Sequence, residues 1–272
     1  MPFTKGHKLA EGKTKIVWSV EEDDHLCVLE SKDDITAGDG AKHDVMGGKA
    51  ALANQTTCNV FELLKQKGVP LAYHCQLDET SFLAERCEML PWEVVGRRKA
   101  WGSYLKRYPE VAKGHRFDPV LVEFFLKTSG KNFEGYPLPE DDPFVVIGSH
   151  GLVSLYNPKL SMTAQEPFLV LGEVRGALFH TSSMARLTSR IFEILEQAWA
   201  SVGGDLIDFK LEFGQNVQGH VCLADVIDND SWRVLDESGE HMDKQAYRDG
   251  ANLDDVTAKY RHAAALTEQF RA

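Results

Sequence analysis

The stretch Leu206–Gly214, LIDFKLEFG, alternates apolar and ionised side chains along its length. Its apolar members include Ile207, Phe209, Leu211 and Phe213, and its ionised members are Asp208, Lys210 and Glu212. Successive side chains of a β-strand point to opposite faces, so the pattern predicts a strand with one apolar face and one ionised face. A solvated edge strand with weak surface ion pairs would also show alternating charge. The unusually apolar flanking residues favour a buried strand whose ionised face serves a site for charged ligands.

The residues after this strand predict a hairpin. GQNVQG, residues 214–219, has the composition of a turn, and HVCLADVI, residues 220–227, reads as the returning strand. The return is expected to bring Asp225 back near Glu212. Paired carboxylates are hard oxygen ligands of the kind that Mg²⁺ uses when it is shared with substrate phosphates. Lys210, between Asp208 and Glu212, would balance their charge or meet an acidic substrate.

Outward from the hairpin, the sequence predicts strands first and then a mixture of strands and helices. Strands are expected at residues 15–20 and 25–32, and helices at residues 49–67, 180–204 and about 254–270. Pro91 interrupts a strand-like region and suggests an edge, a bulge or a crossing between lobes. We therefore expect an α+β protein of two lobes, a β-rich lobe at residues 1–90 and a larger α+β lobe at residues 91–272.

Composition limits the classes of function. The chain has 272 residues, 43% of them hydrophobic, and a formal net charge of −11, which argues against a general nucleic-acid or anionic-membrane surface. No apolar run is long enough to span a bilayer, so we expect a cytoplasmic protein. Five scattered cysteines form no C-x-x-C motif and are expected to be reduced thiols.

Two basic segments are candidates for binding phosphate. AEGKTKIVW, residues 10–18, places Gly12 before Lys13 and Lys15, although a lysine-bearing turn would look the same. EVVGRRKAWGSYLKR, residues 93–107, concentrates basic residues around a Gly-Ser pair and suits a sugar phosphate, or else a cationic exposed face. DDITAGDGAKHD, residues 33–44, reads as a second anion-binding loop or as an ordinary surface turn.

Together and in this order, these segments resemble the SAICAR synthetase family of purine biosynthesis. The motifs that carry the resemblance are EGKTK at residues 11–15, DDITAGDG at 33–40, RxxxxGSxxKR at 97–107, FFLK at 124–127 with DDP at 141–143, LIDFKLEFG at 206–214, and LAD at 223–225 with Arg233 and Asp236 downstream. The resemblance implies a small β-rich, kinase-like ATP lobe joined to a larger α+β lobe. It implies an ATP- and Mg²⁺-dependent ligase that joins L-aspartate to the carboxylate of 4-carboxy-5-aminoimidazole ribonucleotide (CAIR), giving SAICAR, ADP and phosphate.

The resemblance also implies roles for individual residues. The ATP-binding set is Gly12, Lys13, Lys15, Met89 and Lys127, with the backbone of Met89 expected to meet adenine. The substrate-binding set is Asp39, Arg97, Ser103, Arg233 and Asp142, of which Arg97, Ser103 and Arg233 match residues that grip the ribose phosphate. Lys127 and Asp142 also match the region associated with aspartate. The metal ligands implied are Glu212 and Asp225, and the catalytic residues are Lys210 and Asp208.

Other functions stay open at this point. The chain departs from the family pattern at Val226, where an acid is usual, at Arg98, which adds a charge beside the expected phosphate site, and in the longer segment at residues 128–142. A paralogue that ligates a different amine or carboxylate is therefore one alternative. A small-molecule kinase would normally need H-R-D and D-F-G motifs, and neither string occurs. A non-catalytic nucleotide-binding protein would be expected to lose Glu212, Asp225 or the lysines of the site, and all of these remain. The partners expected are small molecules, with a homo-oligomer also implied.

Overall fold

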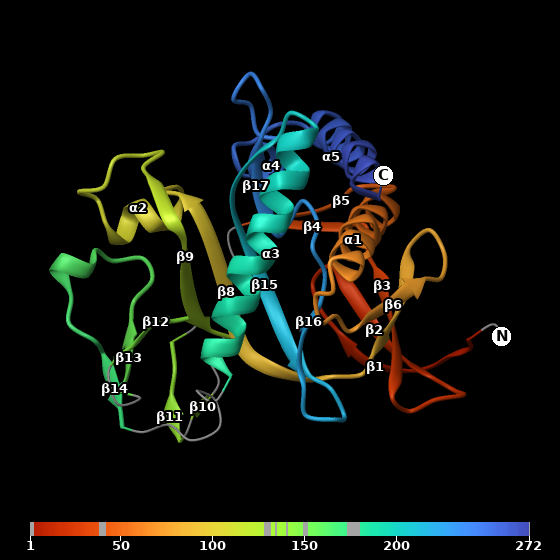
Figure 1. The fold of residues 1–272 in the computed structure, drawn as a ribbon, viewed down its shortest axis with the longest axis horizontal. Coiled ribbons are helices and arrows are strands. Elements are labelled where there is room, and N and C mark those ends of the chain that lie inside the picture. The colour runs from red at the N-terminus through yellow and green to blue at the C-terminus, as the bar shows by residue number, and fades with distance from the viewer. Residues whose placement is uncertain are drawn as a thin grey trace. The chain divides into compact units, whose positions relative to one another are not determined.

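The computed structural model describes residues 3–37, 42–127, 132–133, 135–139, 141–148, 152–172 and 180–271 (Figure 1). The chain divides into two compact units. Unit 1 comprises residues 1–88, 194–206 and 214–272, and unit 2 comprises residues 89–193 and 207–213. The chain first passes between the units at Glu88 and Met89, close to the crossing expected near Pro91. The units nevertheless differ from a simple division at residue 90, because residues 194–206 and 214–272 belong to unit 1 together with residues 1–88.

The sheet of unit 1 has five antiparallel strands in the order β1-β2-β3-β7-β6. These strands are β1 (Lys5–Glu11), β2 (Lys15–Val20), β3 (Leu26–Ser31), β6 (Tyr73–Gln76) and β7 (Ser81–Glu85). The strands predicted at residues 15–20 and 25–32 are confirmed. Val20, Val28 and Leu83 form a buried cluster across three of the strands, so alternating apolar residues give this sheet its core.

Helix α1 (Lys49–Gln66) packs against strands β3, β6 and β7 and against helix α5 (Leu253–Glu268). The carboxylate of Asp33 accepts hydrogen bonds from the backbone N–H groups of Ala50 (2.8 Å) and Gly48 (3.3 Å), so it satisfies donors that the first turn leaves unpaired. Asn252 caps α5 by accepting from the N–H of Asp255 at 2.9 Å. Both helices were predicted. Their packing explains why the C-terminal residues belong to unit 1.

The remaining elements of unit 1 complete its core. They are β4 (Asp34–Ala37), β5 (Lys42–Val45), β16 (Val221–Ala224), β17 (Trp232–Leu235), α4 (Gln245–Arg248) and the 3₁₀-helix η4 (Gln269–Arg271). Strands β4 and β5 pair as an antiparallel hairpin. Ile35 of β4, Met46, Tyr247 of α4 and Val256 of α5 share one buried cluster.

Unit 2 is built on a sheet in which β14, β13, β12, β9, β8 and β15 are successive neighbours. Their bounds are β8 (Glu88–Lys99), β9 (Arg116–Leu126), β12 (Phe144–Ile147), β13 (Val153–Tyr156), β14 (Leu169–Leu171) and β15 (Asp205–Gln215). The middle of β15, residues 207–213, belongs to unit 2, and its two ends belong to unit 1. Strands β16 and β17 also pair with β15. The shorter elements are α2 (Ser103–Arg107), β10 (Asn132–Phe133), β11 (Tyr136–Pro137) and the 3₁₀-helix η3 (Met162–Ala164).

Helix α3 (Thr181–Ser201) is the helix predicted from the clearest apolar periodicity, and its first 13 residues lie in unit 2. It packs closely on the sheet at Gly96. A Cβ atom at this glycine would lie 3.0 Å from the Phe209 ring, 3.1 Å from the Phe192 ring and 3.2 Å from the Thr188 methyl group. Glycine is therefore required here by close approach of helix and strand. No helix among the described residues is long and apolar enough to cross a membrane.

Candidate active site

The ionised face of β15 is matched, charge by charge, by residues of neighbouring segments in unit 2. Asp208 accepts a hydrogen bond from Arg97, and Lys210 donates to Glu93 at 2.9 Å. Glu212 accepts from Lys127. The partners are positive, negative and positive in turn, opposite to the three charges on β15, so each pair has no net charge. The strand predicted from LIDFKLEFG is therefore confirmed, and its second face is a row of ion pairs.

The Asp208 end of this row is buried in a four-charge cluster. Arg97 Nε donates to Glu123 at 2.5 Å, and Arg107 Nη2 donates to the other oxygen of Glu123 at 2.6 Å. The side chains of Arg97, Arg107, Glu123 and Asp208 are at most 5% exposed. Burial alone would lower the pKa of Arg97, but Asp208 and Glu123 outweigh it and raise that pKa. Two arginines and two carboxylates thus compensate one another inside the unit.

Arg97 links this buried cluster to the Gly-Ser segment. Its Nη2 lies 3.4 Å from the Oγ atom of Ser103, the first residue of α2. Gly102 precedes the helix at φ 55°, a conformation that favours glycine. The structure therefore brings together two members of the predicted ribose-phosphate set. Asp208 is buried against the guanidinium of Arg97, which points to a positioning role for Asp208.

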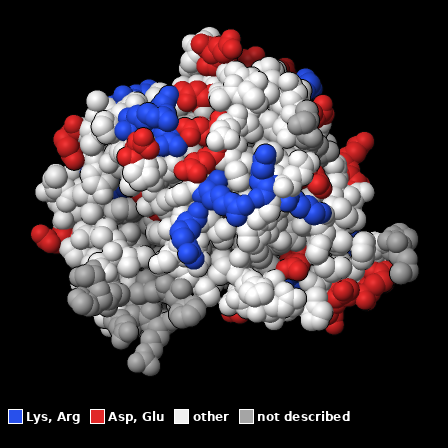
Figure 2. Space-filling model, viewed as in Figure 1, with Lys and Arg blue, Asp and Glu red and all other residues white. Residues whose placement is uncertain are grey.

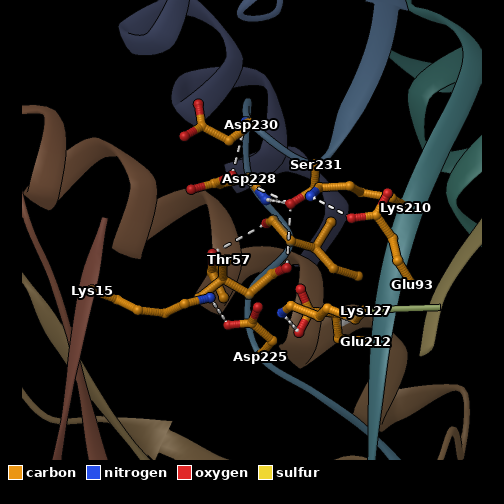
Figure 3. Close-up of polar contacts among 12 residues, drawn as sticks. Lys15, Thr57, Glu93, Lys127, Lys210, Glu212, Asp225, Asp228, Asp230 and Ser231 are labelled. Carbon is orange, nitrogen blue, oxygen red and sulfur yellow. Dashed lines mark hydrogen bonds and ion pairs between the residues drawn. The ribbon is translucent and has the colours of Figure 1, made fainter. Parts of the chain in front are cut away.

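The other two pairs lie nearer solvent. The side chains of Lys210 and Lys127 are each 44% exposed, whereas their partners Glu93 and Glu212 are 24% and 13% exposed. Figure 3 shows the Lys127–Glu212 and Lys210–Glu93 contacts among the side chains drawn. A half-exposed lysine can leave its carboxylate at small cost, because a surface ion pair contributes only about 0–1 kcal/mol. These lysines are therefore free to re-orient toward an anionic ligand.

In unit 1, Lys15 of β2 forms an ion pair with Asp225, directly after β16 (Figure 3). Among the described residues, Asp225 alone combines a non-glycine side chain with a positive φ, of 64°. Aspartate tolerates this region better than most residues, but a single position held there is a mark of functional sites. The neighbouring Val226 accepts a hydrogen bond on its carbonyl oxygen from Ser231 Oγ at 3.3 Å.

The glycine-lysine segment forms the turn between β1 and β2. The N–H of Gly12 donates to the carbonyl oxygen of Lys15 at 2.9 Å, and Lys13 lies exposed in the turn. Gly12 does not adopt a positive φ, and a Cβ atom there would have ordinary contacts, so the fold itself does not require glycine at this position. Met89 is 47% exposed at the start of β8.

The remaining predicted substrate residues are Arg233, Asp142 and Asp39. Arg233 lies on β17 and is partly buried. Asp142 is partly buried just before β12, beside Asp141, which pairs with Lys159 at 2.7 Å. Asp39 lies outside the described residues, as do residues 128–131, 134 and 140 of the longer segment at residues 128–142.

A second buried charge cluster in unit 1 follows Asp225. Asp230 accepts from Tyr260 and pairs with Lys244 at 3.1 Å and Lys49 at 3.5 Å. Burial would raise the pKa of Asp230, but these lysines outweigh it and lower that pKa to about 2. Burial and the nearby Asp230 raise the pKa of Asp228. The loop after Asp225 is therefore held to α1 by the Lys49–Asp230 ion pair and to α5 by the hydrogen bond from Tyr260.

Sequence reasoning missed two carboxylates and misplaced one arginine. Glu93 shares the face of Arg97 by its even spacing on β8, and Glu123 is the single acid within the apolar run of β9, so both left a signal. Arg98 was expected beside the substrate phosphate. The structure shows instead that its guanidinium donates to the Phe117 carbonyl oxygen at 2.9 Å and lies 5.7 Å from the Phe192 ring. Adjacent strand residues point to opposite faces, so Arg98 turns away from Arg97.

Comparison with known proteins decides the family. Residues 8–134 and 174–266 match the family model described as SAICAR synthetase. The chain belongs to the SAICAR synthetase family. The match includes the Lys15–Asp225 pair of unit 1 and the Lys127–Glu212 pair of unit 2.

Members of the SAICAR synthetase family resemble the chain over nearly its whole length. The phosphoribosylaminoimidazole-succinocarboxamide synthase of Herpetosiphon aurantiacus is 41% identical over 98% of this chain and 99% of its own. That of Chloroflexus aggregans is 39% identical over 98% of each. The crystal structure of the synthase from Ehrlichia chaffeensis has a TM-score of 0.75 at 28% identity and covers 96% of this chain and 98% of its own. A SAICAR synthetase in complex with ADP has a TM-score of 0.76 at 27% identity, with coverage of 96% and 97%. The two-lobed α+β fold expected from the sequence is confirmed.

Proposed function

We propose that this chain is a phosphoribosylaminoimidazole-succinocarboxamide synthase. It joins L-aspartate to the carboxylate of CAIR and converts ATP to ADP and phosphate, giving SAICAR in purine biosynthesis. The observation that carries this proposal is the 41% identity to a synthase over 98% of the chain. The presence of Glu212, Asp225, Lys15 and Lys210 at the motif positions supports it, because a non-catalytic relative would be expected to lose some of them. The similarity to a structure that holds ADP supports ATP as the nucleotide.

The reaction explains why the site is rich in paired charges. A carboxylate is a poor acylating agent, so the proposed pathway first converts it to an acyl phosphate that the amine of aspartate attacks. Phosphoryl transfer depends on positioning and on cations beside the phosphate oxygens. Lys15 and Lys127 each supply such a cation, and each is held in place by a carboxylate until the ligand binds. We propose that binding of ATP re-orients these lysines toward its phosphates.

Lys210 is the proposed catalytic lysine. Glu93 holds its ammonium group at 2.9 Å, and the side chain is half-exposed, so it can turn from Glu93 to an anionic substrate. Asp208, proposed from the sequence as a second catalytic residue, is better suited to orient Arg97. Arg97, Ser103 and Arg233 are proposed to hold the ribose phosphate. Asp39 is proposed as a further substrate-binding residue, and Asp142 is proposed for the amino-acid substrate.

Magnesium fits the donor set. Glu212 and Asp225 offer carboxylate oxygens, both side chains are 13% exposed, and hard oxygen donors suit Mg²⁺. We propose these two residues as its ligands. The bound ion would neutralise charge on the phosphates. Each carboxylate pairs with a lysine in this structure. The proposal therefore implies that each carboxylate binds the lysine and the metal together, or that the metal displaces the lysine.

The first test is omission of substrates. ADP release is measured with Mg²⁺-ATP and CAIR while L-aspartate is present, absent or replaced by other amino acids, and products are identified by mass. SAICAR formed only when CAIR and aspartate are both present supports the proposal. Turnover with another amine would make the chain a divergent ligase. ADP release without any amine would indicate a kinase or an ATPase, and nucleotide binding without turnover a non-catalytic protein.

The second test concerns the residues. Lys210→Ala is expected to lower kcat by at least about 100-fold, the typical effect of removing a transition-state electrostatic group. Lys159→Ala is the matched control, because Lys159 also pairs with a carboxylate in unit 2 at 2.7 Å and is 60% exposed. Equal activity of the two variants would refute the role of Lys210. A cytoplasmic location and a homo-oligomeric state remain predictions, which fractionation and light scattering of the native protein test.

A further inference from the structure

Unit 1 contains a cluster of soft and hard metal ligands that the proposed reaction does not use. The Sγ atoms of Cys87 and Cys222 lie 3.5 Å apart. A carboxylate oxygen of Glu85 lies with them, and all three ligand atoms are within 4.8 Å of one another. Cys87 lies in the short link between β7 and β8, and Cys222 lies on β16, so segments 135 residues apart in the chain supply the cluster.

The surrounding residues fix the position of each ligand. A Cβ atom at Gly214 would lie 2.5 Å from the Cβ atom of Cys87, so the last glycine of LIDFKLEFG provides the space for this cysteine. Cys222 Sγ lies 3.7 Å from the Gly214 carbonyl oxygen. Asn216 Nδ2 donates a hydrogen bond to Glu85 Oε2 at 3.1 Å. Such a hydrogen bond to a metal-binding carboxylate fixes its orientation. Cys87 and Glu85 are partly exposed, so the cluster is open to ions from solvent.

We propose that Cys87, Cys222 and Glu85 bind one thiophilic divalent cation, for which Zn²⁺ is the natural probe. Two thiolates on a tetrahedral zinc ion, with Zn–S bonds of about 2.3 Å, lie about 3.8 Å apart. The observed 3.5 Å is within a few tenths of an ångström of that spacing. Three protein ligands leave the fourth position for water or another small ligand.

The ligand types separate this site from magnesium. Thiolates select zinc and other soft ions, whereas Mg²⁺ prefers oxygen ligands alone. A hydrogen bond from Cys222 lowers the pKa of Cys87, against the opposing effects of burial and Glu85. The nearby Cys27 differs, because burial raises its pKa to about 12 and its Sγ lies 3.7 Å from a backbone carbonyl oxygen.

The Glu85 carboxylate also favours cation binding over disulfide formation by the cysteine pair. A thiol pair that exchanges with disulfides is activated by positive neighbours that stabilise its thiolate. Glu85 has the opposite effect on Cys87, and it becomes favourable only when a cation is shared by all three groups. The site lies two residues before Met89, at the passage from unit 1 to unit 2.

The test uses the full-length, reduced protein after removal of metals with a chelator. Zn²⁺ binding is measured by competition with a chromophoric chelator, and Co²⁺ is added as a spectroscopic probe of thiolate ligation. We expect one Zn²⁺ per chain and a thiolate-to-cobalt charge-transfer band. Cys87→Ser and Cys222→Ser are each expected to weaken Zn²⁺ binding by at least about tenfold and to diminish the band. Mutating a residue that only hydrogen-bonds a metal ligand already lowers metal affinity about 10–100-fold, so loss of a ligand itself should cost at least as much. Glu85→Gln is expected to weaken binding while keeping the band.

Two variants serve as matched controls in the same unit. Cys75→Ser removes an exposed thiol outside the cluster, and Glu88→Gln removes an exposed acid three residues from Glu85. Both are expected to bind Zn²⁺ like the unaltered protein. Unchanged binding in the Cys87→Ser/Cys222→Ser double variant would overturn the proposal. Absence of Zn²⁺ binding by the reduced protein would do so as well, and a Cys87–Cys222 disulfide formed in air would then identify the pair as a redox couple.

Discussion

The buried four-charge cluster of unit 2 makes a prediction about the order of two substitutions. Glu123 accepts hydrogen bonds from both Arg97 and Arg107, whereas Asp208 accepts one from Arg97. Glu123→Gln keeps the shape of the side chain but removes the charge that both arginines share. Asp208→Asn removes one of two acids beside Arg97 and leaves the Arg107 pair intact. The first change should therefore be the more destabilising of the two.

The expected magnitudes follow from burial. Arg107 is fully buried, and its guanidinium lies 5.0 Å from the Phe125 ring and 4.7 Å from the Phe144 ring, an apolar setting for a charge. Removing one partner of a buried ion pair costs about 3–5 kcal/mol, which is the loss expected for Glu123→Gln. Loss of one hydrogen bond to a charged group costs about 1.5–3 kcal/mol, the loss expected for Asp208→Asn. An exposed pair contributes less than about 1 kcal/mol.

The assay is urea unfolding followed by tryptophan fluorescence and by far-UV circular dichroism. Lys159→Ala is the control, because its partner Asp141 lies in the same unit and both side chains are well exposed. We expect Lys159→Ala to have the highest free energy of unfolding of the three variants, Asp208→Asn a lower one and Glu123→Gln the lowest. If Asp208→Asn proves as costly as Glu123→Gln, or if both match the control, then the cluster does not act as the distances indicate.

Three further predictions rest on single positions. Gly96→Ala is expected to lower the free energy of unfolding by about 1–3 kcal/mol, because the new Cβ atom would overlap two aromatic rings and a threonine methyl group; a thermal transition at the unaltered temperature would contradict this. The pKa of Asp230 falls from 3.8 to about 2 because Lys49 and Lys244 outweigh burial, so this residue stabilises the fold above pH 3.8 and the gain is lost as the pH falls toward 2. Asp230→Asn should flatten that part of an acid titration of stability, and an unchanged profile would refute the assignment. Lys15→Met is expected to raise the KM for ATP about tenfold, by loss of one charge-assisted hydrogen bond to phosphate, in steady-state assays at saturating CAIR and aspartate; an unchanged KM would remove Lys15 from the ATP site.

The local elements were predictable because their signals are local. The alternation of LIDFKLEFG gives a strand of period two, and apolar periodicity ending at paired glycines gives α3. The motifs EGKTK and LIDFKLEFG carried the family and its reaction without any structure. These signals depend on neighbours within a few residues, so they survive in the sequence whatever the tertiary arrangement.

The pairing of charges was not predictable, because it depends on which segments the fold makes neighbours. The even spacing of Glu93 from Arg97 and the isolation of Glu123 in an apolar run are local signals, and only the adjacency of β8 with β9 and β15 identifies their partners. Arg98 looked like an addition to the phosphate site until strand geometry placed it on the face opposite Arg97. The C-terminal residues likewise belong to unit 1 because α5 packs on α1, although the two helices are about 200 residues apart in the chain.

The order of burial along β15 explains why one strand serves both core and site. Asp208 is buried with Arg97, Glu212 is largely buried, and Lys210 is half-exposed, while the apolar residues between them are at most 1% exposed. A slip of one residue in strand register would turn every side chain to the opposite face, which would bury Lys210 in the core and expose the phenylalanines. The Arg97–Asp208 pair is formed only in the observed register. The apolar face and the buried ion pair therefore specify the same register, and that register sets the position of Lys210, the proposed catalytic lysine, and of Glu212, a proposed metal ligand.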